Sequence, residues 1–257
     1  YYQAGRHGTL CIELLEEALE TNHGLVDAKM HLGAAYFFAD HLPPFVRMFS
    51  KFLWFIPSGN SEKSLPYLLE VVNHGDIYPD VARYIYSYLL LSGAADDRER
   101  AERELMVLVQ SYPFNARFQL RLISILLQEG KFQDSFDTAQ RYITAAAPPT
   151  EPELSLAKIW QVRALMELGR HGQATRLFQD ISPLVKPAGE NLPDWSVYWH
   201  MLTEAQLDDV TNQREQAISG YRQILDNADA LQVSDLVRQA AENGLRVRYQ
   251  PGDQSAQ

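Results

Sequence analysis

The tetrad Gly169-Arg170-His171-Gly172 repeats, residue for residue, the tetrad Gly5-Arg6-His7-Gly8. In both places a stretch rich in helix-forming residues follows the tetrad. A glycine placed just before such a stretch is typical of the turn between two antiparallel helices. The duplication therefore predicts a chain built from repeated helix pairs.

Long stretches without proline provide the helices. Proline inside a helix removes a hydrogen bond and clashes with the preceding turn, so proline-free stretches are the ones that can be helical. In these stretches apolar residues recur at helical spacing, and no sustained alternation indicates a strand. The stretches are residues 80–112, 114–147, 153–182 and 194–250.

Short breaks divide these stretches into pairs of helices. Because each break is too short for a crossover connection, neighbouring helices are expected to be antiparallel. Capping residues predict further helix starts at Ser61 and Asp194. The sequence thus predicts an all-α fold of about 13 helices and no strand. The breaks are residues 93–96, Gly130-Lys131, Gly169-Arg170 and residues 208–212.

A second comparison finds a regular spacing between helix pairs. Ala82 and Ala116 stand near the starts of two pairs and lie 34 residues apart. One helix pair cannot bury its own apolar face, so repeats of this length stack and share a continuous core. The spacing predicts an α-solenoid, a single domain over residues 1–247.

Small and aromatic residues recur at matching positions of the pairs. They are Leu32, Gly33 and Tyr36, with Lys29 before them; Ala101, Leu105 and Pro113; Gly130, Phe132 and Ser135; Gly169, Ala174 and Phe178; and Ala217, Tyr221 and Ile224. These positions resemble the tetratricopeptide repeat family, although Lys29 stands where that family usually has Trp. The resemblance implies a right-handed superhelix whose concave surface, formed by the first helices, binds an extended peptide or a partner helix.

The chain departs from a regular array in three places: an insertion, one lengthened connection and its start. An insertion occupies residues 41–60, and the proline-rich residues 148–152 lengthen one connection. Residues 231–247 are expected to form a helix that covers the last open face, followed by a frayed tail over residues 248–257. The chain begins at Tyr1 without Met, so it is interpreted as a fragment or as a chain that has lost a leader.

The insertion is rich in aromatic residues and lacks acidic ones. Phe45, Phe49 and Phe52 make an interfacial helix over residues 45–56 conceivable, touching a membrane or a partner. The alternative is an extra helix buried against the solenoid, because its apolar residues lie nearly all round. With residues 58–60 and the helix after them, the segment is similar to part of the inclusion-body-clearance repeat proteins and their bacterial relatives.

Several arginines are candidates for partner binding, because a guanidinium group suits a peptide carboxylate or an acidic side chain. The alternative is that they pair with acidic residues on neighbouring helices. Tyr86 lies beside one of them in the sequence. The candidates are Arg83, Tyr86, Arg117, Arg121 and Arg163.

Other function classes find little support in the sequence. The chain has 33 Asp and Glu against 23 Lys and Arg, so the positive face that nucleic acid requires is not expected. Cys11 stands alone and no histidines have zinc-ligand spacing, so no metal or cofactor is expected. No serine-hydrolase elbow and no phosphate loop occur. The acidic run over residues 13–20 is typical of a solvated helix face.

We therefore expect a soluble, non-enzymatic scaffold that binds a protein or peptide. A self-associating or membrane-peripheral subunit that uses residues 45–56 is the alternative, and a helical repeat enzyme is the third possibility. A homo-oligomer is compatible with the scaffold and with the self-associating or membrane-peripheral subunit. The compartment, cytoplasmic or periplasmic, stays open because one cysteine does not identify it.

Overall fold

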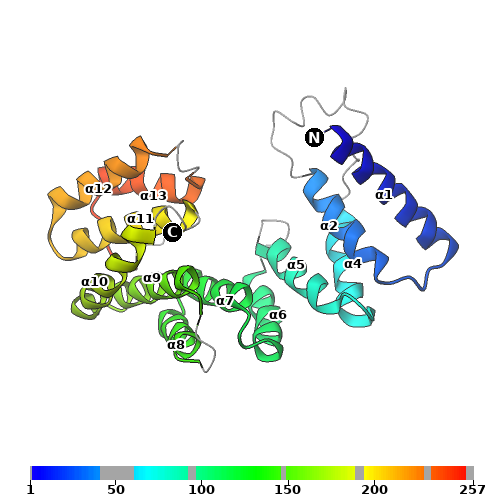
Figure 1. Cartoon of the computed structure of the whole chain (residues 1–257), viewed down its shortest axis with the longest axis horizontal. Helices are drawn as coiled ribbons and strands as arrows, with labels where there is room; N and C mark the ends of the chain where they lie inside the picture. Colours follow the sequence, from blue (N-terminus) through cyan, green and yellow to red (C-terminus); the bar gives the residue numbers. More distant parts are fainter. Residues whose placement is uncertain are drawn as a thin grey trace. The chain divides into compact units, whose positions relative to one another are not determined.

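The computed structural model describes residues 2–40, 61–91, 97–145, 149–188, 194–228 and 233–252. These ranges hold twelve α-helices and no strand (Figure 1). The predicted all-α class is therefore confirmed. The chain divides into two compact units, Tyr1–Ser111 and Tyr112–Gln257, called unit 1 and unit 2 below.

Unit 1 is a series of helices that pack in chain order. Helix α1 packs on α2, α2 on α4, α4 on α5 and α5 on α6. Helix α2 also contacts α5, so the first helices of two successive pairs touch. The helices are α1 (Tyr2–Thr21), α2 (Ala28–Asp40), α4 (Ser61–His74), α5 (Pro79–Leu91) and α6 (Arg98–Ser111).

Unit 2 repeats this arrangement. Each helix packs on the next, and α7, α9, α11 and α13 also contact one another in series, which makes a layer of first helices. Helix α13 contacts both α11 and α12 and covers the last pair, as expected. The helices are α7 (Ala116–Gln128), α8 (Phe132–Ile143), α9 (Glu151–Glu167), α10 (His171–Ala188), α11 (Asp194–Val210), α12 (Arg214–Asp226) and α13 (Asp235–Arg246).

Within each unit the stacked pairs have the architecture of an α-solenoid, and this prediction is confirmed. The single domain over residues 1–247 stays a prediction, because the two units are described separately. The inserted helix over residues 41–60, with Phe45, Phe49 and Phe52, lies outside the described residues.

A small buried residue is the fourth residue in five helices, each of which is the second helix of its pair: α4, α6, α8, α10 and α12. These residues are Ser64, Ala101, Ser135, Ala174 and Ala217, each at most 1% exposed. Further buried residues follow four and seven positions later, for example Leu105 and Leu108 in α6 or Tyr221 and Ile224 in α12. The small side chain lets the paired helix approach closely, and the later residues fill the shared core.

The turns within the three pairs of unit 2 are alike. Gly130, Gly169 and Asn212 adopt left-handed conformations with φ of 74°, 69° and 66°. In each turn the next residue donates its N–H to the carbonyl five positions earlier, as Arg170 does to Leu165 at 2.8 Å. This pattern is a Schellman motif, which satisfies the last carbonyls of a helix and reverses the chain. The turns predicted at these three places are confirmed.

The first tetrad, Gly5–Gly8, does not mark a turn, which corrects the interpretation of the duplication. It lies inside α1, a helix that begins at Tyr2. A glycine at ordinary helical φ costs only about 1 kcal/mol relative to alanine. The helix-forming residues that follow, up to Thr21, outweigh that cost. The repeat is therefore carried by the buried positions of the second helices, not by the tetrads.

The start of the tail is also ordered, in contrast to the predicted frayed end. Tyr249 is only 7% exposed. Its backbone N–H donates to Asp209 at 3.0 Å, and its hydroxyl donates to Glu167. The N–H of Gly252 donates to the other oxygen of Glu167 at 2.7 Å. A buried aromatic ring and two carboxylate acceptors thus fix residues 248–252, while residues 253–257 lie outside the described ranges.

Candidate binding cleft

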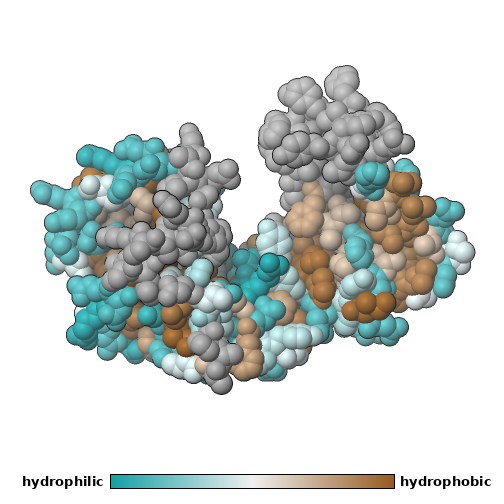
Figure 2. Space-filling view, viewed as in Figure 1, coloured by the Kyte–Doolittle hydropathy of each residue, from teal (hydrophilic) through white to brown (hydrophobic). Residues whose placement is uncertain are grey.

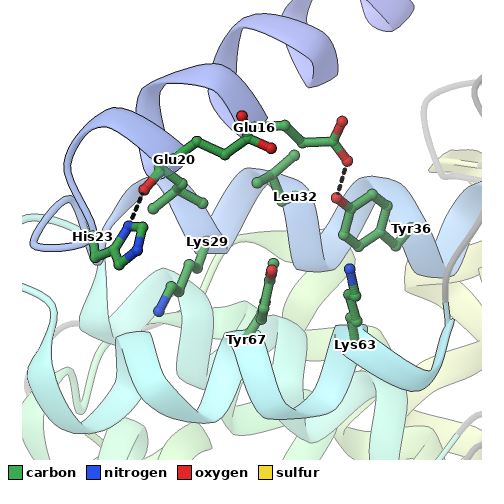
Figure 3. Close-up of a pocket in the computed structure, with 9 residues that line it drawn as sticks. Glu16, Glu20, His23, Lys29, Leu32, Tyr36, Lys63 and Tyr67 are labelled. Carbon is green, nitrogen blue, oxygen red and sulfur yellow. Dashed lines mark hydrogen bonds between the residues drawn. The ribbon is translucent and has the colours of Figure 1, made fainter.

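A cleft of about 430 Å³ opens between α1, α2 and α4 of unit 1 (Figure 3). It is lined by side chains from all three helices, and charged groups stand on opposite sides of an apolar floor. The lining residues are Glu16, Leu19, Glu20, His23, Lys29, Leu32, Tyr36, Lys63 and Tyr67.

Helix α1 supplies an acidic wall. Glu16 and Glu20 are one helical turn apart, so both carboxylates lie on one face of the helix. Glu16 accepts a hydrogen bond from the hydroxyl of Tyr36 on α2 (Figure 3). Burial and this acidic neighbour raise the pKa of Tyr36. At the end of the wall, Nδ1 of His23 lies 2.5 Å from the carbonyl oxygen of Leu19.

Helices α2 and α4 supply a basic wall. The Nζ atom of Lys29 lies 2.5 Å from Oε1 of Glu70 and 5.6 Å from the centroid of the Tyr67 ring. Lys63 is exposed at the rim. Neither Lys63 nor Glu20 forms an ion pair with any residue in the described ranges. Two opposite charges on the two walls are therefore available to a ligand.

The floor of the cleft is apolar and aromatic. Leu19 and Leu32 are buried, and Leu32 has no exposed surface. The rings of Tyr36 and Tyr67 stand 6.1 Å apart between centroids, tilted by 45°. An apolar side chain of a ligand can be desolvated on this floor while its polar neighbours meet the charged walls.

One carboxylate fixes the start of α2. Asp27 accepts hydrogen bonds from the backbone N–H groups of Asp76, Ile77 and Tyr78, at 3.0 to 3.2 Å. Burial opposes ionisation of Asp27, but the three donors outweigh it and lower its pKa. The connection between α4 and α5 is thereby tied to the helix that carries Lys29 and Tyr36.

Two of the predicted binding residues lie between α5 and α6 of unit 1. Arg83 forms an ion pair with Glu104. Tyr86 is 2% exposed, and the guanidinium carbon of Arg100 lies 5.1 Å from its ring centroid. Arg83 thus follows the alternative interpretation, in which an arginine pairs with an acidic residue on a neighbouring helix.

The other three predicted arginines lie in unit 2. Arg117 is exposed in the first turn of α7, and Arg121 is half-buried one turn later. Arg163 is only 7% exposed and donates from Nη1 to Gln206 of α11 at 2.7 Å. The predicted arginines are therefore divided between the two units.

The lining of the cleft was missed by sequence reasoning. The acidic run over residues 13–20 was interpreted as a solvated face, and Tyr36 as a packing residue. A usable signal was the pair Glu16 and Glu20 on a helix that precedes a helix with Lys29 and Tyr36. This sequence signal identifies the charged residues. It does not show which faces of the helices lie opposite each other in the fold.

The chain matches no protein-family model, no curated protein and no solved structure. Among the described helices, none is long and apolar enough to cross a membrane. In the same parts of the chain no three His, Cys, Asp or Glu residues are grouped so that they could hold a metal ion.

Proposed function

We propose that the chain is a non-enzymatic scaffold of tetratricopeptide repeat type that binds a segment of a partner protein in the cleft of unit 1. The observation that carries the proposal is the cleft itself, in which Glu20 and Lys63 stand on opposite sides of an apolar floor. The recurring small residue in the second helices supports the repeat type.

The tyrosine chemistry of the cleft favours binding over catalysis. Burial and Glu16 raise the pKa of Tyr36, so its hydroxyl stays protonated at neutral pH and donates to Glu16. A general base needs a pKa near the working pH. Tyr36 therefore holds the acidic wall in place and does not accept a proton from a ligand.

The cleft lies over a first helix, α2, and between two second helices, α1 and α4. This position differs from the predicted groove on the first-helix face, which stays a prediction. A suitable partner segment presents an apolar side chain to Leu19 and Leu32. It carries a basic group toward Glu20 and an acidic group toward Lys63.

Exposed apolar side chains add to the interaction surface of unit 1. Leu10 and Leu14 on α1 are 49% and 55% exposed, and Val81 on α5 is 48% exposed. Figure 2 shows hydrophobic surface over both helices. Leu10 and Leu14 lie one helical turn apart on α1, and exposed apolar residues grouped in this way are typical of protein contact sites.

Charge reversal in the cleft tests the proposal. Lys63→Glu and Glu20→Lys each place two like charges where a partner meets opposite ones. We expect retention of the partner from cell extract to fall at least about tenfold in each variant. Arg103→Glu is the matched control, because Arg103 is 66% exposed on α6 and pairs only loosely with Glu99. Equal retention by the native chain and both cleft variants would contradict the proposed site.

A further inference from the structure

Residues 248–252, called the strap below, lie across the C-terminal ends of two neighbouring first helices of unit 2. The N–H of Tyr249 donates to Asp209, near the end of α11, at 3.0 Å. The Tyr249 hydroxyl donates to Glu167, the last residue of α9. The N–H of Gly252 donates to the other oxygen of Glu167 at 2.7 Å. The strap is thus held by two carboxylates that belong to different helices.

The contacts of the strap are those of a short bound peptide. The backbone is extended where it leaves α13, with φ of −132° and ψ of 140° at Val247. Tyr249 is buried and belongs to the apolar cluster that also contains Trp160 of α9 and Leu207 of α11. The residues on either side of Tyr249 in the strap are exposed. One buried aromatic anchor combined with backbone hydrogen bonds is a common pattern of peptide recognition.

The seat of the strap consists of Glu167, Asp209 and the apolar surface under the Tyr249 ring. Contacts that do not involve the strap fix this seat. Asp209 also accepts from Arg214 and from the hydroxyl of Tyr221, each at 2.9 Å. Helices α9 and α11 pack on each other and on α10. Departure of the strap therefore leaves Asp209 oriented and both helices in place.

The hydrogen bonds of the seat select what can occupy it. In the three bonds to Glu167 and Asp209, and in a fourth from Nη1 of Arg248 to Oδ1 of Asn212 at 2.9 Å, the seat accepts and the strap donates. The C-terminal ends of the two helices add further negative charge. The seat therefore suits a segment that presents donors and a basic group, and it disfavours an acidic one.

We propose that the seat is a binding site for a partner polypeptide and that the strap occupies it when the partner is absent. The partner supplies an extended segment with a tyrosine, a basic residue before it and a free backbone N–H three residues after it, as the strap does. Because the seat cannot hold both segments, the partner must displace the strap. The apparent affinity is then reduced to the fraction of chains whose strap is open.

The site lies in unit 2 and does not depend on the cleft of unit 1, so either proposal can fail without the other. The probe is an amidated, fluorescein-labelled peptide with the sequence of residues 246–252, and its fluorescence anisotropy reports binding to the full chain. Tyr249→Ala in the chain empties the seat without changing Glu167 or Asp209. We expect saturable binding to the native chain and binding at least about tenfold tighter to Tyr249→Ala. The same peptide carrying Tyr249→Ala should bind neither chain.

A second variant opens the strap without removing the buried ring. Gly252→Pro deletes the N–H that donates to Glu167, and proline cannot adopt the φ of 84° found at this position. We expect this variant, too, to bind the peptide more tightly than the native chain does.

Glu167→Gln, added to Tyr249→Ala, tests the seat itself. An amide keeps the shape of the side chain but cannot accept at both of its ends, so we expect the affinity to fall about tenfold. Glu99→Gln is the matched control, because Glu99 is 84% exposed on α6. The proposal is overturned if the native chain does not bind the peptide saturably, which would make the strap a permanent part of the fold. It is also overturned if neither opened variant binds more tightly, or if Glu167→Gln has no effect.

Discussion

The ring of Tyr221 on α12 lies directly against the backbone of Gly244 on α13. A Cβ atom at position 244 would overlap three carbons of the ring. Tyr221 itself has no exposed surface, and its hydroxyl donates to Asp209 of α11 at 2.9 Å. This single side chain therefore ties together the three helices that close unit 2.

Gly244→Ala tests this contact. Alanine favours helix by about 1 kcal/mol over glycine, but here its methyl group displaces a buried ring. Overpacking of this kind costs about 1 to 3 kcal/mol. We expect the free energy of unfolding, from denaturant titration, to fall. Gly172→Ala is the control, because a Cβ there meets no atom within 4 Å and the variant should be unchanged or more stable. A stabilised Gly244→Ala variant would show that the ring can move away.

We expect replacement of Asp209 to destabilise unit 2 strongly. Its buried side chain accepts from Arg214 at 2.9 Å, from the Tyr221 hydroxyl and from the N–H of Tyr249. Asp209→Asn removes the charge that pairs with Arg214 and replaces one acceptor with a donor. We expect a loss of about 3 kcal/mol in unfolding free energy.

Tyr221→Phe is the milder companion variant, with an expected loss of about 1 kcal/mol. Limited proteolysis supplies a second readout, since Asp209→Asn should also expose residues 248–252 to cleavage. An Asp209→Asn variant as stable as Tyr221→Phe would mean that the carboxylate charge contributes nothing.

Gly169→Ala tests the left-handed turn. The change places a Cβ at φ of 69°, which costs about 1 kcal/mol. Gly172→Ala, three residues later, is the matched control because that glycine lies inside α10 and has room for a Cβ. We expect thermal unfolding to show a lower melting temperature for Gly169→Ala alone. Equal melting temperatures of the two variants would contradict the strain at position 169.

Asp208 should make stability depend on pH. Burial, together with Glu204 and Asp209, raises its pKa from 3.8 to about 6. The folded state therefore holds this proton more tightly than the unfolded state, so the contribution of Asp208 to stability falls as pH rises from 3.8 to about 6. Asp208→Asn should remove that part of the pH dependence and stabilise the chain above pH 6 by about 1 kcal/mol after solvent screening. Identical unfolding profiles of the two proteins between pH 4 and pH 7 would contradict the raised pKa.

The helix pairs and their turns could be predicted because their signals are local. Gly130 and Gly169 each precede a helix, and both adopt the left-handed conformation. The same reasoning was wrong at Gly5, because an identical tetrad carries no information about whether another helix ends before it. The prediction of a frayed tail was wrong for residues 248–252, because these residues bind Glu167 and Asp209, which are distant in sequence.

The cleft could not be predicted because it, too, depends on contacts between residues that are distant in sequence. Its walls come from α1, α2 and α4, and the sequence does not show which faces of these helices lie opposite each other.

The environment of the predicted arginines could not be read from the sequence either. Arg83 and Arg163 have the same chemistry, yet Arg83 pairs with Glu104, whereas Arg163 is buried and forms no ion pair with the residues that the structure describes. Only the packing of neighbouring helices distinguishes them.

Photocrosslinking from the cleft tests the central claim most directly. An aromatic photoreactive residue replaces Tyr67, which lines the cleft, in one version of the full chain and Arg103 in a second, so that Glu20 and Lys63 stay in place. We expect a discrete protein adduct from position 67, lost when Glu20→Lys is added, and no adduct from position 103. Absence of any adduct at position 67, or equal adducts at both positions, would contradict a partner site in this cleft.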